Sequence, residues 1–184
     1  MSDAALAWRD FMVSDYSDAG QERWLAANGI ALLRGSGRLA GTGAVDVGGV
    51  RHTADHVVVA CGADPLIPPI PGLRELDGVW TNREVTGMKA VPRRLLILGG
   101  GPVGVEMAQA VRRFGGDVVL IEGSRHVLAR EPAPLGEVLG EVLRRDGIEL
   151  VLGTHATDAR RDGDEYVLTL DDGRNRRGET RISA

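Results

Sequence analysis

The chain has 184 residues, 43% of them hydrophobic, which is enough for one ordinary domain or two small ones with a packed core. Its formal net charge of −4 gives no electrostatic support for a protein that binds nucleic acid or an anionic membrane. No apolar run approaches the roughly 20 residues that span a bilayer, and the first ten residues do not resemble a signal peptide. A single cysteine, Cys61, excludes an internal disulfide, so a cytoplasmic protein is expected.

The first 62 residues are expected to contain one helix and four short strands. The helix, over residues 17–27, ends at an Asn-Gly pair, which is a common stop signal. Two of the strands flank a Gly-Gly pair typical of a two-residue hairpin turn, and the other two are short apolar runs. The predicted strands are residues 30–33, 44–47, 50–53 and 55–60.

A proline-rich connector follows over residues 63–72. Its prolines fix the backbone φ angle and exclude a helix. Residues 73–92 carry a weaker pattern, with a short helix predicted near residues 82–89. This stretch leads directly into the most informative part of the chain.

A short apolar run at residues 94–98 passes into a glycine-rich turn, and a helical pattern begins at once. Gly99, Gly101 and Gly104 fit G-x-G-x-x-G, the phosphate-binding turn of a dinucleotide-binding βαβ unit. The first glycine permits the tight turn, the second lets a pyrophosphate approach the backbone, and the third lets the helix lie close to the sheet. The N-terminus of the helix then offers N–H groups and a positive dipole end to the phosphates.

The surrounding pattern favours a dinucleotide site over an ordinary glycine-rich turn. Pro102 suits the first turn of a helix, and residues 118–121 form a continuous apolar run, as in a parallel strand buried on both faces. Glu122 closes that strand about 20 residues beyond the glycines, where a carboxylate can accept hydrogen bonds from the adenosine ribose. The apolar stripe predicted for the helix consists of Val103, Met107, Ala110, Val111 and Phe114.

A second amphipathic helix, ended by Gly147, and a third strand at residues 148–152 complete the order β-α-β-α-β. This order predicts an α/β, Rossmann-like domain with a parallel sheet and right-handed crossovers. Residues 165–170 and the turn at residues 171–174 predict a hairpin, whereas residues 175–184 are expected to be loose. The apolar positions of the second helix are Leu135, Val138, Leu139, Val142 and Leu143.

Three motifs, in this order, resemble the pyridine nucleotide-disulfide oxidoreductases, a flavoenzyme family that includes dihydrolipoamide dehydrogenase, mercuric reductase and glutathione reductase. Residues 54–65 are similar to the family segment A-D-x-(V/I)-(V/I)-x-A-T-G-S-x-P, residues 67–72 to its crossover between domains, and residues 95–106 to its NAD(P) fingerprint. The resemblance implies a partial FAD-binding segment and crossover over residues 1–72, followed by an NAD(P)-binding domain over residues 73–184.

Other parts of the family pattern are missing from the sequence. It has no first G-x-G-x-x-G for FAD, no spaced pair of redox cysteines, and no C-terminal dimerisation domain with its catalytic His. The chain is therefore interpreted as an internal piece of a longer enzyme, with FAD held in the parent protein only. Cys61 stands where the family usually has Thr, and is expected to be a small buried residue rather than a redox centre.

The resemblance also implies roles for individual residues. Glu106 matches a family glutamate that lies near the nicotinamide and helps to position it for hydride transfer; a solvated helix carboxylate is the alternative. Glu122 favours NAD over NADP because a carboxylate there would face the extra phosphate of NADP. Ser124, Arg125 and Arg130 follow closely, and an arginine fork could hold such a phosphate. The cofactor-binding candidates are Gly99, Gly100, Gly101, Pro102, Val103, Gly104, Glu122, Gly123, Ser124 and Arg125.

No metal or nucleic-acid site is expected. His52 and His56 have the i, i+4 spacing of helical metal ligands, but they lie in a predicted strand and turn, where that geometry fails. The arginine pairs at residues 112–113 and 144–145 fall near helix C-termini, where positive charge is stabilising. The remaining histidines, expected in loops or on the surface, are His126 and His155.

Two functions remain open. In the first, the parent protein is a soluble FAD- and NAD(P)-dependent oxidoreductase, and this region positions the nicotinamide for hydride transfer to flavin. In the second, the chain is a non-catalytic NAD(P)-binding module or an inactive truncated fragment; by itself it is expected to be inactive. Because residues 57–59 would lack partner strands, residues 1–62 are expected to be disordered or to form a homo-oligomer through an exposed apolar edge.

Overall fold

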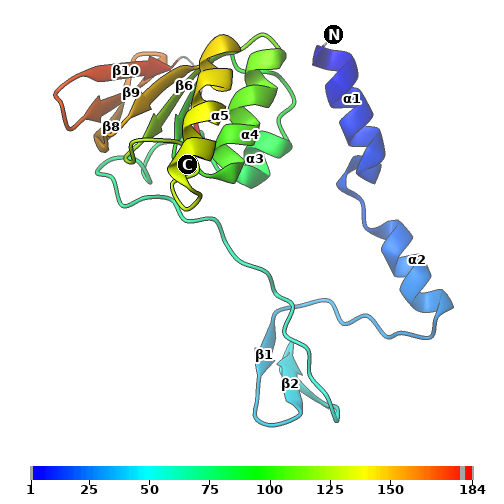
Figure 1. Ribbon diagram of the computed structural model, residues 1–184. Helices are drawn as coiled ribbons and strands as arrows, with labels where there is room; N and C mark the ends of the chain where they lie inside the picture. The colour runs from blue at the N-terminus through cyan, green and yellow to red at the C-terminus, as the bar shows by residue number, and fades with distance from the viewer. Residues whose placement is uncertain (1, 179–180, 184) are drawn as a thin grey trace. The chain divides into compact units, whose positions relative to one another are not determined.

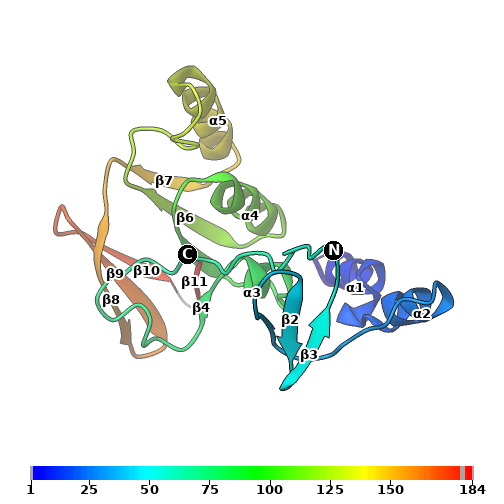
Figure 2. The same cartoon turned by 90° about the horizontal axis from the view of Figure 1, so that it is seen from below.

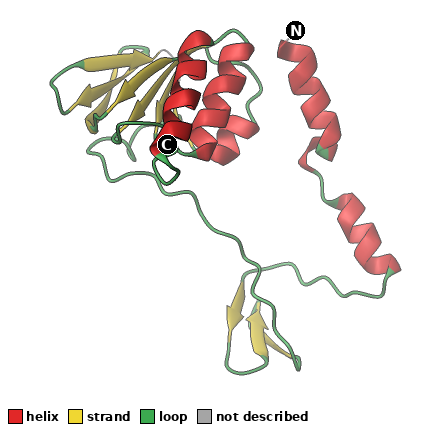
Figure 3. Cartoon of the chain, viewed as in Figure 1, coloured by secondary structure: helices red, strands yellow, loops and turns green. Residues whose placement is uncertain are grey.

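The computed structural model describes residues 2–178 and 181–183, which fall into two compact units. One unit is formed by Met1–Ala7 together with Pro65–Ala184, and the other by Trp8–Asp64. Figure 3 shows their helices, strands and loops. The predicted boundary between residues 72 and 73 separates an FAD-binding segment from an NAD(P)-binding domain. It concerns cofactor binding rather than packing, and it stays a prediction.

The larger unit is built around a five-stranded parallel sheet with the strand order β4-β11-β5-β6-β7. Its strands β5, β6 and β7 are joined through helices α4 and α5, which confirms the predicted β-α-β-α-β order and the α/β class with a parallel sheet. The strands are β4 (Val79–Trp80), β5 (Arg94–Leu98), β6 (Asp117–Glu122), β7 (Glu149–Leu152) and β11 (Arg181–Ser183).

Different layers cover the two faces of this sheet (Figures 1 and 2). Successive side chains of a strand point to opposite faces. Leu95 and Ile97 accordingly pack in one apolar cluster with helices α4 and α5, while Leu96 packs in a second cluster with β9. The covering elements are α4 (Pro102–Arg113) and α5 (Ala133–Arg145) on one face, and the antiparallel sheet of β8 (Ala156–Asp162), β9 (Glu165–Leu170) and β10 (Asn175–Gly178) on the other.

Helix α4 forms where predicted, and its buried face matches the predicted stripe only in part. Val111 of that stripe is buried, but Val103 is 50% exposed and Phe114 lies at the surface. The other buried residues are Val105 and Ala108, which the stripe omitted. Gly104 at the start of the helix brings this face close to β5.

The stripe predicted for helix α5 is also correct only in part. Leu143 is buried in the core and Leu139 packs against it, whereas Leu135 and Val138 are each 60% exposed. The helix also buries Gly136 and Gly140. A Cβ atom on Gly136 would lie 2.2 Å from a backbone carbonyl oxygen of the preceding loop, so an apolar pattern that ignores glycine misses this part of the buried face.

Several elements of the larger unit were not predicted or were predicted wrongly. Helix α1 (Ser2–Met12) contributes Leu6 to the core on the helical face of the sheet. The short helix predicted near residues 82–89 is confirmed as α3 (Asn82–Thr86). The expectation that residues 175–184 are loose is wrong for strands β10 and β11, which pair with β9 and with β4 and β5; residues 179, 180 and 184 lie outside the described residues.

The smaller unit contains the predicted hairpin. Gly48 and Gly49 have φ values of +58° and +83°, as the favoured two-residue turn requires. The predicted helix is confirmed from Ala19 onward, and an additional strand extends the hairpin into a three-stranded antiparallel sheet. The elements are the 3-10 turn η1 (Ser14–Tyr16), α2 (Ala19–Ala27), β1 (Gly37–Leu39), β2 (Ala44–Val47) and β3 (Val50–Thr53).

Two predicted strands of this unit are wrong. Residues 30–33 and 55–60 have no regular secondary structure and no strand pairing among the described residues, and Val58 is 86% exposed. A strand needs a hydrogen-bonding neighbour, and these apolar runs find none in the part of the chain that is described. Cys61 follows the second run and is exposed, so the expectation that it is buried is also wrong.

Candidate dinucleotide-binding site

The glycine turn between β5 and α4 has the geometry that its spacing predicts. Gly99 has a φ of +103°, which favours glycine, and its N–H donates to the carbonyl of Ile121 at 2.8 Å. A Cβ atom on Gly104 would lie 2.1 Å from the carbonyl oxygen of Gly99, so only glycine permits this close approach of helix to strand. A Cβ atom on Gly101 would meet nothing within 4 Å among the described residues, which leaves open space in front of the turn.

The same turn ends at the N-terminus of α4. Gly101 is the residue before the helix, with an extended backbone (φ −71°, ψ 179°), and Pro102 occupies the first turn. Glycine has no side chain with which to cap the helix, so the first N–H groups face the open space beside Gly101. Such a terminus presents N–H donors and a partial positive charge to an anion.

Glu122 fixes the turn from the end of β6. One carboxylate oxygen accepts from the N–H of Gly100 at 2.6 Å, and the other accepts from the N–H of Ser124 at 2.7 Å. Partial burial disfavours the charged form, but these backbone hydrogen bonds outweigh burial, and the pKa of Glu122 lies below its usual range. The site therefore carries a fixed negative charge at neutral pH.

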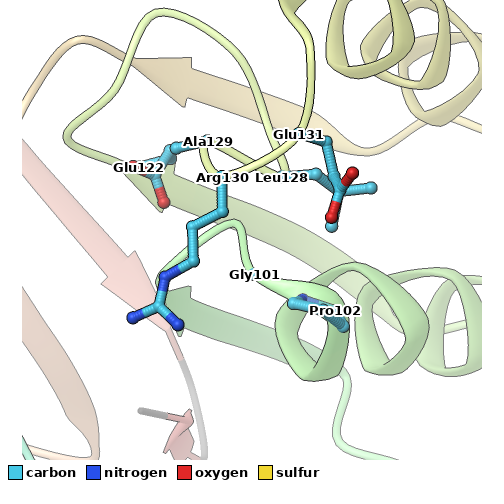
Figure 4. A pocket seen from close by; sticks show the side chains of 7 residues that line it. All are labelled: Gly101, Pro102, Glu122, Leu128, Ala129, Arg130 and Glu131. Carbon is cyan, nitrogen blue, oxygen red and sulfur yellow. The ribbon is translucent and has the colours of Figure 1, made fainter.

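Three cavities adjoin this turn. The first, of about 450 Å³, is drawn in Figure 4 and is bounded by the start of α4, Glu122 and a loop over residues 128–131. The second, of about 250 Å³, extends from the end of β5 along the turn to Val103 and Gly104. The third, of about 480 Å³, lies at the carboxyl ends of β5, β6 and β7. Ligands of open α/β sheets bind at this edge.

The loop over residues 128–131 is tied to the glycine turn. The N–H of Leu128 donates to the carbonyl of Gly100 at 2.7 Å, and the N–H of Glu131 donates to the carbonyl of Leu128 at 2.8 Å. Leu128 has a φ of +53°, which is unusual for a bulky residue. Arg130 extends from this loop alongside the turn, while Glu131 projects to the opposite side (Figure 4). A guanidinium group thus lines the same cavity as the start of α4.

Most of the predicted site residues meet around these cavities. Gly100 lies behind them, with its N–H and its carbonyl both used to hold the turn. Glu106 is exposed on α4 and Arg125 is exposed in the loop after β6, and neither lines the three cavities. The predicted residues that do line them are Gly99, Gly101, Pro102, Val103, Gly104, Glu122, Gly123 and Ser124.

Sequence reasoning missed several residues that line the cavities. Arg130 was considered only as a possible phosphate ligand, and the loop around it was not predicted. His155 was expected to be an ordinary loop residue, but it lines the third cavity at the end of β7. The sequence offered one signal for both residues: the loop that carries Arg130 follows strand β6, and His155 follows strand β7, so both lie beyond the carboxyl ends of parallel strands. The other missed lining residues are Pro68, Ile70, Ile97, Leu98, Ile121, Leu128, Ala129, Glu131, Thr154 and Ala156.

Within the described part of the chain, no group of three or more His, Cys, Asp or Glu side chains could hold a metal ion. His52 lies on β3 and His56 beyond it, so the two do not share a helix face. No helix in the described residues is both long enough and apolar enough to cross a membrane.

Comparison with known proteins gives consistent matches. Residues 9–184 match the family described as pyridine nucleotide-disulphide oxidoreductase. The chain is 32% identical to dihydrolipoyl dehydrogenase of Thermus scotoductus over 88% of its length, and 34% identical to mercuric reductase of Acidithiobacillus ferrooxidans over 92%. It spans only about a third of these relatives, 35% and 32% of their lengths.

Solved structures share the fold over nearly the whole chain. The HOCl-induced flavoprotein disulfide reductase RclA from Escherichia coli has a TM-score of 0.87 at 22% identity. LpdA from Mycobacterium tuberculosis has a TM-score of 0.80 at 26% identity. Each comparison covers 99% of this chain and 42% of the solved chain.

Proposed function

The chain belongs to the pyridine nucleotide-disulphide oxidoreductase family, and from this premise we propose that it is the NAD(P)-binding portion of an FAD-dependent pyridine nucleotide oxidoreductase. Its role is to position the nicotinamide for hydride transfer to flavin. One observation carries the proposal: open space lies in front of Gly101, at a helix N-terminus, within reach of a charged carboxylate at the end of the next strand. The nicotinamide supplies the hydride chemistry when it is bound.

The residues present fit such a cofactor. The N–H groups at the start of α4 would hold the diphosphate, and the Arg130 guanidinium, which lines the same cavity, adds a positive charge. Glu122 would accept hydrogen bonds from the adenosine ribose hydroxyls with the carboxylate lone pairs that its hydrogen bonds to Gly100 and Ser124 leave free. Val103 and Gly104, beside the second cavity, lie toward the part of the dinucleotide beyond the diphosphate.

The charge at Glu122 supports NAD over NADP. Its low pKa keeps the carboxylate ionised at neutral pH, and an ionised carboxylate would repel a 2′-phosphate on the ribose. Arg130 is the nearby group that favours the opposite choice, because it lines the same cavity as Glu122. We propose that the carboxylate dominates, since backbone hydrogen bonds hold it at the end of β6.

Glu106 is proposed as the residue that positions the nicotinamide. It is exposed on the second turn of α4, two residues beyond Gly104, the last glycine of the motif. This assignment depends on the family, because in the present structure the side chain lines none of the three cavities. For Glu106 to have this role, the nicotinamide ring must extend from the second cavity along helix α4.

Calorimetric titration of the purified chain with NADH tests the proposal. Gly101→Val should weaken NADH binding by at least about tenfold, because the new side chain enters the space in front of the turn. The backbone at Gly101 has a φ of −71°, which any residue can adopt, so the variant should fold. Its unfolding temperature should be only slightly below that of wild type, because valine is a poorer helix N-cap than glycine.

Gly20→Val is the matched control. Gly20 is also exposed, and the nearest atom to a Cβ there is a flexible arginine nitrogen at 4.0 Å, but it lies on α2 of the smaller unit. This variant should bind NADH like wild type. Failure of wild type to bind NADH at millimolar concentration, or unchanged binding by Gly101→Val, would contradict the proposal.

The second candidate is a binding module without oxidoreductase activity of its own. The span of about a third of the relatives' length favours it for the chain by itself. An absorbance spectrum of the same preparation separates the two candidates: we expect NADH binding without a flavin band. A flavin band near one FAD per chain would rule out the isolated module.

A further inference from the structure

The loop over residues 128–131 is anchored where it begins. Val127, the residue before the loop, is fully buried in the core cluster on the helical face of the sheet, and Leu128 packs against the same cluster. Helix α5 lies directly against this point, because a Cβ atom on Gly136 would lie 2.2 Å from the carbonyl oxygen of Val127. The start of the loop therefore cannot move without disturbing the core or the helix.

Leu128 has a backbone conformation that bulky residues rarely adopt. Its φ of +53° lies in the left-handed region, which is unfavourable for a residue with a Cβ atom. Two hydrogen bonds hold this conformation: the N–H of Leu128 donates to the carbonyl of Gly100 at 2.7 Å, and its carbonyl accepts from the N–H of Glu131 at 2.8 Å. Strained residues of this kind persist only where their surroundings hold them, and they concentrate at functional sites. The backbone of Leu128 thus fixes the loop to the glycine turn.

Arg130 is a cation that this loop brings to the site. Its side chain extends alongside the glycine turn, whereas Glu131 projects to the opposite side (Figure 4). Among the described residues, the Arg130 guanidinium has no hydrogen-bond or ion-pair partner, even though Glu122 lines the same cavity. Its donors are therefore available to an anionic group of a ligand in that cavity.

The arrangement of the cavities indicates which anionic group this is. Arg130 lines the first cavity together with Gly101 at the start of α4, where the proposed function places the diphosphate. Glu122, the proposed ribose ligand, lines both the first and the third cavity. The third cavity continues from Glu122 past Gly123, and Arg130 does not line it. Arg130 therefore lies on the diphosphate side of the ribose.

We infer that Leu128 is a positioning residue: its left-handed backbone, held by Gly100, presents the Arg130 guanidinium to the diphosphate of the dinucleotide and not to a 2′-phosphate. This inference rests on the proposed function. It assigns Arg130 to a part of the ligand that NAD and NADP share. Arg130 then contributes to the affinity for both nucleotides and not to the choice between them, which is left to Glu122.

Calorimetric titrations of Arg130→Gln with NADH and NADPH test the assignment to the diphosphate. The substitution removes a charge at an exposed position, so the variant should fold. Binding of NADH should weaken about fivefold, the size expected for one solvated charge contact, and binding of NADPH should weaken by the same factor. The ratio of the two dissociation constants should therefore stay at its wild-type value. A guanidinium that held the 2′-phosphate would instead weaken NADPH binding alone.

Arg145→Gln is the matched control. Arg145 is also exposed, but it lies in the last turn of α5 and lines none of the three cavities. The same charge is removed from the chain, so an effect of net charge alone would weaken binding in both variants. Arg145→Gln should bind NADH like wild type.

Leu128→Ile and Leu128→Met test the positioning role. Both keep an apolar side chain of similar size, but the β-branched isoleucine disfavours the left-handed backbone more strongly than the unbranched methionine does. Leu128→Ile should weaken NADH binding about as much as Arg130→Gln, whereas Leu128→Met should retain most of the affinity. In a chain that already carries Arg130→Gln, Leu128→Ile should have no further effect, because it acts through the guanidinium. If Leu128→Ile does not fold, Leu128→Val gives the same comparison.

The outcomes distinguish this inference from the proposed function. If wild type does not bind NADH, the proposed function fails, and this inference fails with it. If wild type binds NADH but Arg130→Gln binds it equally well, or Arg145→Gln weakens it by as much, the assignment of Arg130 to the diphosphate is overturned and the proposed function stands. If Leu128→Ile leaves NADH binding unchanged, or weakens it equally in the Arg130→Gln background, the positioning role of Leu128 is overturned.

Discussion

At the scale of single residues, Glu122 does two things at once. It accepts hydrogen bonds from the N–H groups of Gly100 and Ser124, and so holds the glycine turn and the loop after β6 together. It also places a negative charge at the position proposed above for the ribose of a dinucleotide. A glutamine at this position cannot take over both roles, because its side-chain amide cannot accept from the N–H groups of Gly100 and Ser124 at the same time.

We predict that Glu122→Gln destabilises the fold by about 1–3 kcal/mol at pH 7. The NH2 group of the glutamine is only a donor, so one of the two backbone N–H groups would lose its acceptor. The pKa of Glu122 is lowered in the folded state, so its contribution to stability is present above the usual carboxyl range and is lost as the pH falls through the folded-state pKa.

Urea unfolding at several pH values between 7 and 3 measures this effect. The difference in the free energy of unfolding between wild type and Glu122→Gln should become smaller in the acid range, because the glutamate loses its charge there and the glutamine does not titrate. Glu106→Gln is the control, because Glu106 is exposed on helix α4. It should change the free energy of unfolding by less than about 0.5 kcal/mol. A constant difference at all pH values would contradict the prediction.

The sequence identifies the residues whose role is local. Gly99, Gly101 and Gly104 could be predicted because the turn, the open approach and the close helix packing each require glycine at a fixed spacing. Arg130 was predicted only as a possible phosphate ligand. The position of its loop and that of His155 could not be predicted, because a hydrogen bond to Gly100 sets the first and the fit of a ring against Gly123 sets the second. No spacing rule encodes these tertiary contacts.

At the scale of elements, the short helix α3 depends on its first residue. Thr81 accepts from the N–H of Arg83 at 3.2 Å, and its own N–H donates to Glu84 at 2.6 Å, a reciprocal capping box. The hydroxyl of Thr81 also donates to Glu84, and these hydrogen bonds hold the pKa of that carboxyl below its usual range. The helix carries Val85, which is fully buried.

Thr81→Ala should therefore lower the free energy of unfolding by about 1 kcal/mol, the usual cost of losing such a cap. Thr81→Ser keeps the hydroxyl and should lose less than half as much. Guanidinium unfolding curves, compared at equal slope, measure both changes. An equal loss in the two variants would show that packing of the threonine methyl group, rather than capping, stabilises this helix.

Element positions could be predicted better than the faces that elements bury. The helices between residues 99 and 147 lie where apolar periodicity and glycine stops place them. Their buried sides contain Ala108, Gly136 and Gly140, small residues that a hydrophobic pattern weights lightly or not at all. Close packing against the sheet selects these residues, whereas larger apolar side chains such as Val138 are left at the surface.

At the scale of the whole molecule, the smaller unit leaves many apolar side chains exposed. Val57, Val58 and Val59 form an extended run whose exposed fractions are 38%, 86% and 65%. The sequence suggests a strand here, and the structure leaves the run without strand pairing in the described residues. A backbone with free N–H and C=O groups beside apolar side chains readily pairs with another chain.

We predict that the purified chain self-associates through this run. Val58→Lys should shift it toward the monomer, because a charged side chain opposes strand pairing at an exposed edge. Val138→Lys is the control, since Val138 is also an exposed valine, at 60%, but it lies on helix α5 and not beside an open strand edge. Sedimentation velocity over a range of concentrations measures both. A monomeric wild type, or equal effects of the two substitutions, would contradict the prediction.

The position of β11 has a consequence for synthesis on the ribosome. This strand lies between β4 and β5, yet it is translated after every other strand of the parallel sheet. A nascent chain that has already completed the glycine turn still has a gap in the middle of its central sheet. The parallel sheet is therefore complete only after a strand enters between two that were made long before it, and until then the facing edges of β4 and β5 are open to pairing with another chain.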